Sequence, residues 1–137
     1  MRLIASGVLI GALTFALATQ AGASRFHGGC NTHRCLERVC RSAACKGRVA
    51  NRLATARKRR ATRPYRAWLY STRMCESGGN YGIATGNGYF GAYQFDLASW
   101  RGAGGSGMPH LNPPLEQDYR AVRWRQMVGT GAWPVCG

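Results

Sequence analysis

An apolar segment at the N-terminus decides how much of this chain is available to fold. Met1-Arg2 is a short basic start, residues 3–18 are apolar or small, and Ala21-Gly22-Ala23 has the small-x-small pattern of a cleavage site. The segment is too short to span a bilayer comfortably, so it predicts a removable signal peptide at residues 1–23; an uncleaved membrane anchor is the alternative. We therefore expect a secreted protein with no membrane segment after cleavage, whose remaining 114 residues form one small domain and an appendage.

Six cysteines follow the apolar segment, at positions 30, 35, 40, 45, 75 and 136. In an exported protein, an even number of cysteines is typical of disulfide bonding. The first four belong to a repeated pattern, C-x4-C-x2-R-V, that occupies residues 30–39 and then 40–49. These four allow three pairings among themselves, and the repeat favours Cys30–Cys35 and Cys40–Cys45. A zinc site built from these thiols and His27 or His33 is the alternative.

The charge divides the chain into two regions. Residues 24–66 contain thirteen Lys and Arg and one acid, a net charge of +12, whereas residues 67–137 contain five Arg and four acids, a net charge of +1. We expect a basic Cys-rich helical segment over residues 24–63 and a second domain over residues 64–137. The dense charge predicts that residues 24–66 attract anionic polymers, although a solvated helix face is the plainer interpretation. Export favours phosphate polymers or acidic glycans of the wall over nucleic acid as the partner.

The pattern of apolar residues predicts a mainly helical chain. Helical spacing predicts helices over residues 48–62, 65–76 and 112–128, with Pro64 ending the first and Ser-Gly-Gly-Asn at 77–80 ending the second. Gly86-Asn87-Gly88 lies between two short β-prone stretches and predicts a hairpin turn. Asp96 is placed to cap a short helix that runs through Trp100. The fold class that follows is α+β, mainly helical, with a short β-hairpin.

Glu76 is the acid whose surroundings suit catalysis best. It ends a predicted helix directly after Cys75, and five aromatic residues follow within a short stretch: Tyr81, Tyr89, Phe90, Tyr93 and Trp100. Apolar surroundings raise the pKa of a carboxyl group, and glycoside cleavage needs an acid that is still protonated near neutral pH. A glutamate near a helix end is also typical of an ordinary surface residue, so the residues alone leave both interpretations open.

Three motifs in this region resemble one known family. They are Cys75-Glu-Ser-Gly-Gly-Asn80, Thr85-Gly-Asn-Gly-Tyr-Phe-Gly-Ala-Tyr-Gln-Phe95 and Gly131-Ala-Trp-Pro-Val-Cys136, with Ser99-Trp100 between the last two. In this order and spacing they resemble the catalytic domain of the resuscitation-promoting factors, the transglycosylase-like branch of the lysozyme superfamily. Gly91-x-x-Gln94 also resembles the wider lytic transglycosylases. The resemblance covers about residues 68–136 and says little about residues 24–60.

The resemblance implies a small lysozyme-like domain over residues 64–137, with Glu76 as the catalytic acid and a disulfide between Cys75 and Cys136. It implies a secreted or cell-wall-associated glycosidase whose substrate is the peptidoglycan glycan strand, between N-acetylmuramic acid and N-acetylglucosamine. We expect substrate contacts at Tyr89, Tyr93, Gln94, Ser99 and Trp100, and we expect Trp133 to be a core residue beneath the site.

The mechanism depends on how many carboxylates take part. A two-carboxylate mechanism needs a second acid at roughly 5–9.5 Å, and only Asp96, Glu116 and Asp118 are available in the second region. In a single-carboxylate mechanism Glu76 protonates the glycosidic oxygen and then acts as base while the 6-hydroxyl of muramic acid attacks C1 of the same sugar. We favour this route to a 1,6-anhydro product, with hydrolysis as the close alternative; neither needs a metal or an organic cofactor.

Two alternatives belong to other functional classes. The family often has a Gln and a Trp before the final Gly-Ala-Trp, where this chain has Val128-Gly-Thr. A non-catalytic wall-binding or signalling protein that keeps the fold is therefore the second hypothesis. A cationic polyanion binder, in which residues 24–66 act and the remainder is a scaffold, is the third.

Overall fold

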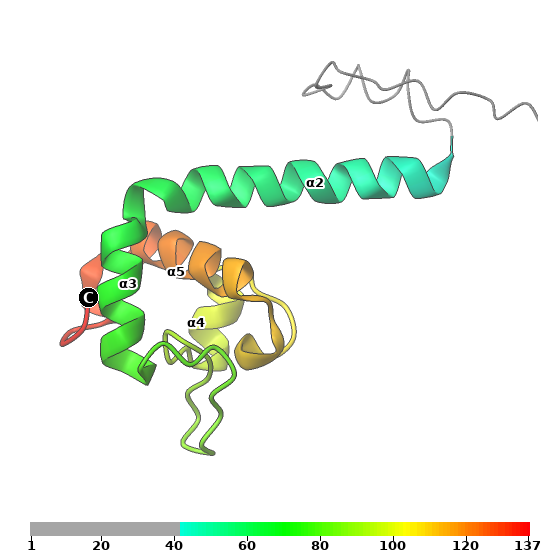
Figure 1. The fold of residues 1–137 in the computed structure, drawn as a ribbon. Helices are drawn as coiled ribbons and strands as arrows, with labels where there is room; N and C mark the ends of the chain where they lie inside the picture. Colours follow the sequence, from blue (N-terminus) through cyan, green and yellow to red (C-terminus); the bar gives the residue numbers. More distant parts are fainter. Residues whose placement is uncertain (1–41) are drawn as a thin grey trace, which may run out of the picture. The chain divides into compact units, whose positions relative to one another are not determined.

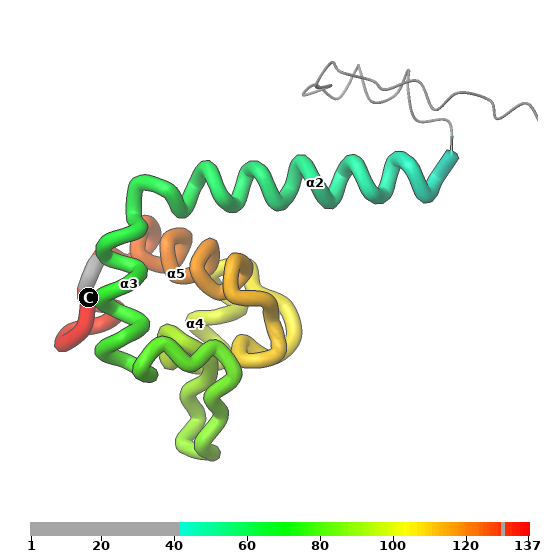
Figure 2. The backbone as a smooth tube through the Cα atoms, viewed as in Figure 1, coloured from blue at the N-terminus to red at the C-terminus, as the bar shows by residue number. Residues whose placement is uncertain are grey.

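The computed structural model of this chain describes residues 42–137 (Figures 1 and 2). In chain order the elements are α2 (Ala43–Thr62), η1 (Arg63–Tyr65), α3 (Arg66–Ser77), α4 (Leu97–Gly102), η2 (Pro109–Leu111), α5 (Pro114–Val128) and η3 (Thr130–Ala132). These residues are mainly helical, as the periodicity predicted. The predicted signal peptide and three of the four repeat cysteines lie outside the described residues.

The helix ends follow local signals in the sequence. α2 starts after Ser42, whose Oγ accepts a hydrogen bond from the Cys45 N–H at 3.2 Å. It stops before Pro64, which falls in the short η1 turn instead of continuing the α-helix. Asp96 caps α4 as predicted, because its Oδ1 accepts a hydrogen bond from the Ser99 N–H at 2.8 Å. The described part of the chain contains no helix that is both long enough and apolar enough to cross a membrane.

The predicted β-hairpin is not confirmed. In residues 42–137 strand pairing is limited to two isolated antiparallel bridges, Ala84 with Phe90 and Phe90 with Phe95. The turn itself lies where it was expected, since Gly86 and Gly88 have φ of 82° and 87°, a region that glycine enters readily. Phe90 pairs in both bridges, so the chain folds back on both sides of this residue without forming two regular strands. Figure 2 shows this backbone leaving the helices and doubling back.

An aromatic core joins the helices. Trp133 is 5% exposed, and its ring lies edge-on against Trp68, Tyr93 and Phe95, with centroid distances of 5.3, 6.3 and 5.6 Å. Its indole Nε1 donates a hydrogen bond to the Tyr93 carbonyl at 2.8 Å. Large aromatic side chains contribute most of the apolar area that a small domain can bury. Trp133 is therefore the core residue that we expected beneath the site.

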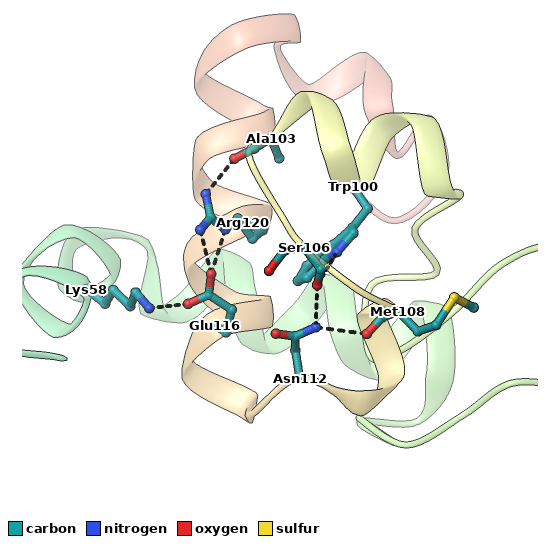
Figure 3. Close-up of polar contacts among 8 residues, drawn as sticks. All are labelled: Lys58, Trp100, Ala103, Ser106, Met108, Asn112, Glu116 and Arg120. Carbon is teal, nitrogen blue, oxygen red and sulfur yellow. Dashed lines mark hydrogen bonds and ion pairs between the residues drawn. The ribbon is translucent and has the colours of Figure 1, made fainter. Parts of the chain in front are cut away.

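An ionic cluster attaches the last turns of α2 to the rest of the fold (Figure 3). Glu116, in the first turn of α5, forms ion pairs with Lys58 of α2 and with Arg120, whose Nη2 lies 2.6 Å from Glu116 Oε1. Arg120 also donates from Nη1 to the Ala103 carbonyl at 2.9 Å, directly after α4. Further along, Gln126 Nε2 donates to the Tyr65 hydroxyl at 3.2 Å. One basic residue of α2 therefore belongs to the packed domain.

Figure 3 also shows how the glycine-rich loop after α4 is held. Asn112 Nδ2 donates to the Ser106 and Met108 carbonyls at 3.0 and 2.8 Å. Trp100 Nε1 donates to the same Ser106 carbonyl at 3.3 Å. Gly105 approaches the Trp100 ring so closely that an added Cβ would lie 2.2 Å from it. The loop between residues 103 and 112 is thus folded over the Trp100 ring.

Candidate active site

Glu76 lies in the last turn of α3, and the residues on both sides of it are anchored to other segments. Cys75 forms the disulfide with Cys136, with the two Cα atoms 5.7 Å apart, which confirms the pairing that the family resemblance implied. Ser77 Oγ donates a hydrogen bond to the Ala92 carbonyl at 2.9 Å. Glu76 is therefore held between the C-terminal segment and the turn at residues 91–95.

One helical turn earlier, a buried hydroxyl strengthens the same attachment. Thr72 is fully buried, and its Oγ1 donates to the Cys136 carbonyl at 3.0 Å. The disulfide and this hydrogen bond join the same two segments on one face of α3. The helix that carries Glu76 therefore has little freedom to rotate or slide against the C-terminal segment.

The end of α3 is set by glycine. Gly78 has φ of 62°, and the N–H groups of Gly78 and Gly79 bond to the carbonyls of Met74 and Arg73 at 3.1 and 2.9 Å. This left-handed cap is a common way for a helix to end, and glycine adopts it without a steric penalty. The chain turns away immediately after Ser77, which leaves the Glu76 carboxyl at the helix end, half-buried.

The surroundings of Glu76 favour its protonated form. Burial is the cause that raises its pKa above the ordinary value for glutamic acid. The C-terminal end of a helix carries partial negative charge, which also disfavours a carboxylate there. A carboxyl group with a raised pKa keeps its proton closer to neutral pH, which is the property that a general acid needs.

The turn that Ser77 contacts has an unusual backbone. Gln94 has φ of 47°, a left-handed conformation that is rare for residues other than glycine, asparagine and aspartate. Its Nε2 donates to the Gly91 carbonyl at 3.0 Å, which closes the turn. A strained residue of this kind costs on the order of 1–3 kcal/mol and is often found at a functional site.

A buried glutamine supports the turn from below. Gln117 of α5 is 1% exposed, and its Oε1 accepts from the Ala92 N–H at 3.0 Å. Its Nε2 donates to the Tyr81 and Asn112 carbonyls at 3.0 and 2.9 Å. Gly91 passes so close that an added Cβ would lie 2.3 Å from Gln117 Oε1. Glycine is therefore required at this position of the motif.

The Asp118 carboxylate is hydrogen-bonded to two tyrosines. Its Oδ1 accepts hydrogen bonds from the Tyr81 and Tyr93 hydroxyls at 2.7 and 2.6 Å. Burial, followed by the hydrogen bond to Asp118, raises the pKa of Tyr81 to about 12 and also raises the pKa of Tyr93. Both hydroxyls therefore remain protonated donors, and this carboxylate serves a structural network between α5 and the segment after α3.

The other two acids of the described region, Asp96 and Glu116, also have hydrogen-bond partners. The Ser99 N–H lowers the pKa of Asp96 by bonding to its carboxylate, and Ser99 Oγ adds a second bond at 2.7 Å. Burial raises the pKa of Glu116, but hydrogen bonds from Lys58 and Arg120 outweigh that effect and lower it. Among residues 42–137, Glu76 is thus the carboxylate for which burial, and no partner, explains the shifted pKa. The same residues contain no group of three His, Cys, Asp or Glu side chains that could hold a metal ion.

The residues expected to contact substrate lie in different environments. Tyr89 is 49% exposed at the end of the glycine turn, and Gln94 and Ser99 are half-buried. Tyr93 and Trp100 are fully buried, so they support the site from the core and do not present a face to a ligand in this structure. Their burial is explained by the Asp118 network for Tyr93 and by the folded loop for Trp100.

Comparison with known proteins identifies the family of this region. A family model described as the transglycosylase-like domain matches residues 65–136, which begins just before α3 and ends at the disulfide cysteine Cys136. This chain belongs to the transglycosylase-like family. The matched region contains all the residues that the resemblance placed in the site, from Cys75 to Cys136.

Several relatives of the transglycosylase-like domain are named resuscitation-promoting factors. The chain is 48% identical over 62 residues to resuscitation-promoting factor Rpf of Micrococcus luteus, which covers 45% of this chain and 28% of that protein. It is 48% identical over 64 residues to RpfE of Mycobacterium tuberculosis, 47% of this chain and 37% of that protein. With RpfB of Mycolicibacterium smegmatis the identity is 43% over 66 residues, 46% of this chain and 18% of that protein. The chain thus spans less than half the length of these relatives.

Sequence reasoning missed the structural roles of three residues: Gln117, Asp118 and Ser77. Gln117 lies four residues before Ala121 and seven before Trp124, on an apolar stripe of the predicted helix, and a polar residue on such a stripe signals a buried hydrogen-bonding role. Asp118 gave no comparable signal, because its partners Tyr81 and Tyr93 are more than twenty residues away in the sequence. Ser77 was noted only as part of a motif, and its bond to Ala92 depends on the tertiary fold.

Proposed function

We propose that the transglycosylase-like domain cleaves the glycan strand of peptidoglycan between N-acetylmuramic acid and N-acetylglucosamine, with Glu76 as its single catalytic carboxylate. The observation that carries this proposal is the isolation of Glu76. It is half-buried at a helix end fixed on both sides, whereas each of the other three acids in residues 42–137 is bound by other side chains or by a helix N-terminus.

The steps follow from this arrangement. Protonated Glu76 donates its proton to the glycosidic oxygen as the bond from C1 of muramic acid breaks. The carboxylate that remains then removes the proton of the muramic acid 6-hydroxyl, whose oxygen bonds to C1 of the same sugar. Glu76 regains its proton, and the products are a 1,6-anhydromuramic acid end and a free 4-hydroxyl on N-acetylglucosamine. The attacking group is already held on the substrate, so the step has the advantage of an intramolecular reaction.

The surrounding residues have distinct parts in this proposal. Tyr89, Gln94 and Ser99 carry polar or aromatic groups that are at least partly exposed, and we assign them to saccharide contact. Tyr93, Trp100 and Trp133 are positioning residues, because they fix the turn and helix that carry the contacting groups. Relatives named resuscitation-promoting factors support a role at the bacterial cell wall, and the protein is proposed to be secreted to reach it.

Mass spectrometry of the products from purified peptidoglycan tests the route. At each cut, the single-carboxylate route predicts that the fragment ending in muramic acid is lighter by one water than the corresponding hydrolysis product, because the 6-hydroxyl takes the place of water at C1. Fragments with reducing muramic acid ends would instead show that water attacks C1. Fragments cut at the other glycosidic bond of the repeat would overturn the assignment of the substrate bond.

A further inference from the structure

The surface of α2 carries positive charge that the fold does not use. Residues 43–62 contain seven Lys and Arg and no acid, and Arg63 and Arg66 follow directly. Like charges four residues apart on a helix, such as Arg48 and Arg52, destabilise it. In the described part of the chain, Lys58 is the one residue of α2 that forms an ion pair, and it faces α5. The other basic side chains of α2 lower the stability of the helix by repelling one another, and none of them forms an ion pair within the described residues.

Part of this charge forms a row on one side of the helix. With 100° between successive residues, Arg48, Arg52 and Arg59 of α2 and Arg63, the residue that caps its C-terminus, fall within a sector about 60° wide, turned about 110° from Lys58. We call these four residues the arginine row. All four side chains are exposed, and the rise of the helix spaces the row over about 22 Å. The row therefore lies away from the surface through which α2 packs on α5.

A shallow depression that is open to solvent lies in the middle of the row. Asn51, Arg52, Thr55, Ala56 and Arg59 line this depression of about 380 Å³. Thr55 and Ala56 are small, so the Arg52 and Arg59 side chains on either side of them are open to solvent. Asn51 and Thr55 add hydrogen-bond donors beside them. Two guanidinium groups with neighbouring polar donors suit a phosphate group, which arginine binds through two parallel hydrogen bonds.

We infer that the arginine row of α2 binds a linear phosphodiester polymer of the cell wall, of the polyol-phosphate class. Adjacent arginines of the row are separated by roughly one Debye length or less at physiological salt, so their fields act together on a chain of repeated charges. A single phosphate would engage only the depression, whereas a polymer would engage the whole row. This inference does not rest on the proposed catalytic function.

Two other polyanionic partners fit the surface less well. Single-stranded nucleic acid is usually held by aromatic side chains that stack on bases, and residues 43–62 contain no aromatic residue. A helix that lies on a membrane has large apolar side chains opposite its basic face. The largest apolar residues of α2 are Val49 and Leu53, and both are half-buried.

A charge-matched comparison tests the inference. The full-length chain is titrated with soluble poly(glycerol phosphate), and the Kd is measured by calorimetry at several salt concentrations. Arg52→Gln/Arg59→Gln removes two charges from the row, and Arg101→Gln/Arg123→Gln removes two exposed charges elsewhere. The row variant should bind at least tenfold more weakly, with the slope of log Kd against log salt reduced by about 1.4 for two lost phosphate contacts. The control variant should stay within twofold of the unsubstituted chain.

Other outcomes would overturn it. Equal weakening in both variants would mean that net charge and not the row attracts the polymer, and unchanged binding by the row variant would exclude the row. Single-stranded DNA of equal charge, or vesicles with anionic lipid, binding tenfold more tightly than the polymer would identify a different partner. If circular dichroism shows that Arg52→Gln/Arg59→Gln does not fold, Arg48→Gln/Arg63→Gln tests the same row with the same expected loss.

Discussion

At the scale of single residues, the site combines a carboxyl group and a backbone that are both held in unfavourable states. Burial disfavours the charged form of Glu76, and Gln94 is held in a left-handed conformation. Both features persist because neighbouring residues fix them: Cys75 and Ser77 for the acid, and Gly91 for the turn. We therefore expect that removing the charge of Glu76, or the backbone strain at residue 94, makes folding more favourable.

Glu76→Gln should make the protein as stable as, or more stable than, the unsubstituted chain at pH 7. A carboxyl group whose pKa is raised on folding contributes stability that is fully present below its unfolded pKa and is lost as the pH rises through the folded value. The amide carries no charge and is free of this loss. Thermal unfolding at pH 7 and at pH 3.5 should therefore show a gap in Tm that closes at the lower pH. A lower Tm for the variant at pH 7 would mean that the charged form of Glu76 stabilises the fold.

Gln94→Gly and Gln94→Ala separate backbone strain from side-chain contact. Both variants lose the side-chain hydrogen bond to the Gly91 carbonyl and keep the backbone N–H of residue 94 that also donates to it, but only glycine adopts φ of 47° without strain. Glycine should therefore give the more stable variant by about 1 kcal/mol, as measured by urea unfolding. If alanine is the more stable of the two, the turn does not store the strain that its backbone indicates. Both should cut peptidoglycan poorly if the side chain contacts the saccharide.

At the scale of elements, two attachments position α3 and α2 against the rest of the domain. A disulfide and the Thr72 hydrogen bond hold α3 against the C-terminal segment, and the Glu116 ion pairs hold α2 and the end of α4 against α5. The first attachment includes Cys75, the residue before the proposed catalytic acid, whereas the second involves residues of α2, α4 and α5. Their loss should therefore affect catalysis differently.

Replacing both Cys75 and Cys136 by serine should destabilise the protein by about 4 kcal/mol, because the bridge closes a loop with a sequence separation of 61 residues. Urea unfolding measures the loss. Thr72→Val removes the neighbouring hydrogen bond and should cost only about 1 kcal/mol. A double serine variant within 1 kcal/mol of the unsubstituted chain would show that packing alone holds this segment.

Glu116→Gln should cost about 1.5–3 kcal/mol at pH 7, since Lys58 and Arg120 lose a charged partner. The pKa of Glu116 is lowered in the folded protein, so its contribution is present above the unfolded pKa and is lost as the pH falls through the folded value. The difference in unfolding free energy between the two proteins should shrink below about pH 4. A difference that does not change with pH would mean that the charge of Glu116 is irrelevant. Arg123→Gln, at an exposed position on the same helix, should have little effect.

At the scale of the whole molecule, local signals predicted the helices better than they predicted the contacts between them. Pro64, Gly78 and Asp96 act on the backbone next to them, so the sequence places the ends of α2, α3 and α4 within a few residues. The two expected strands did not form, since glycines surround the turn and Phe90 pairs on both sides.

The positions of the candidate site residues were predictable where a local motif determines them and not where distant residues meet. The motif places Glu76 at a helix end, where the structure has it, and Tyr89 is exposed; the catalytic role of Glu76 and the substrate contact of Tyr89 stay predictions. Tyr93 looked equivalent to Tyr89 in the sequence, yet its hydroxyl finds Asp118 on another helix and the ring is buried. A short-range pattern contains no information about a partner 25 residues away.

The turnover of purified peptidoglycan by Glu76→Gln, compared with Asp118→Asn, tests the central claim most directly. The amide keeps the shape of Glu76 but has no catalytic proton, and general acid catalysis contributes about 10²–10⁴-fold. Asp118→Asn keeps an acceptor for the two tyrosine hydroxyls and removes a different carboxylate of the domain. We predict a loss of at least about a hundredfold for Glu76→Gln and less than about tenfold for Asp118→Asn, with both proteins folded by circular dichroism. Glu76→Gln within about tenfold of the unsubstituted chain would contradict the assignment.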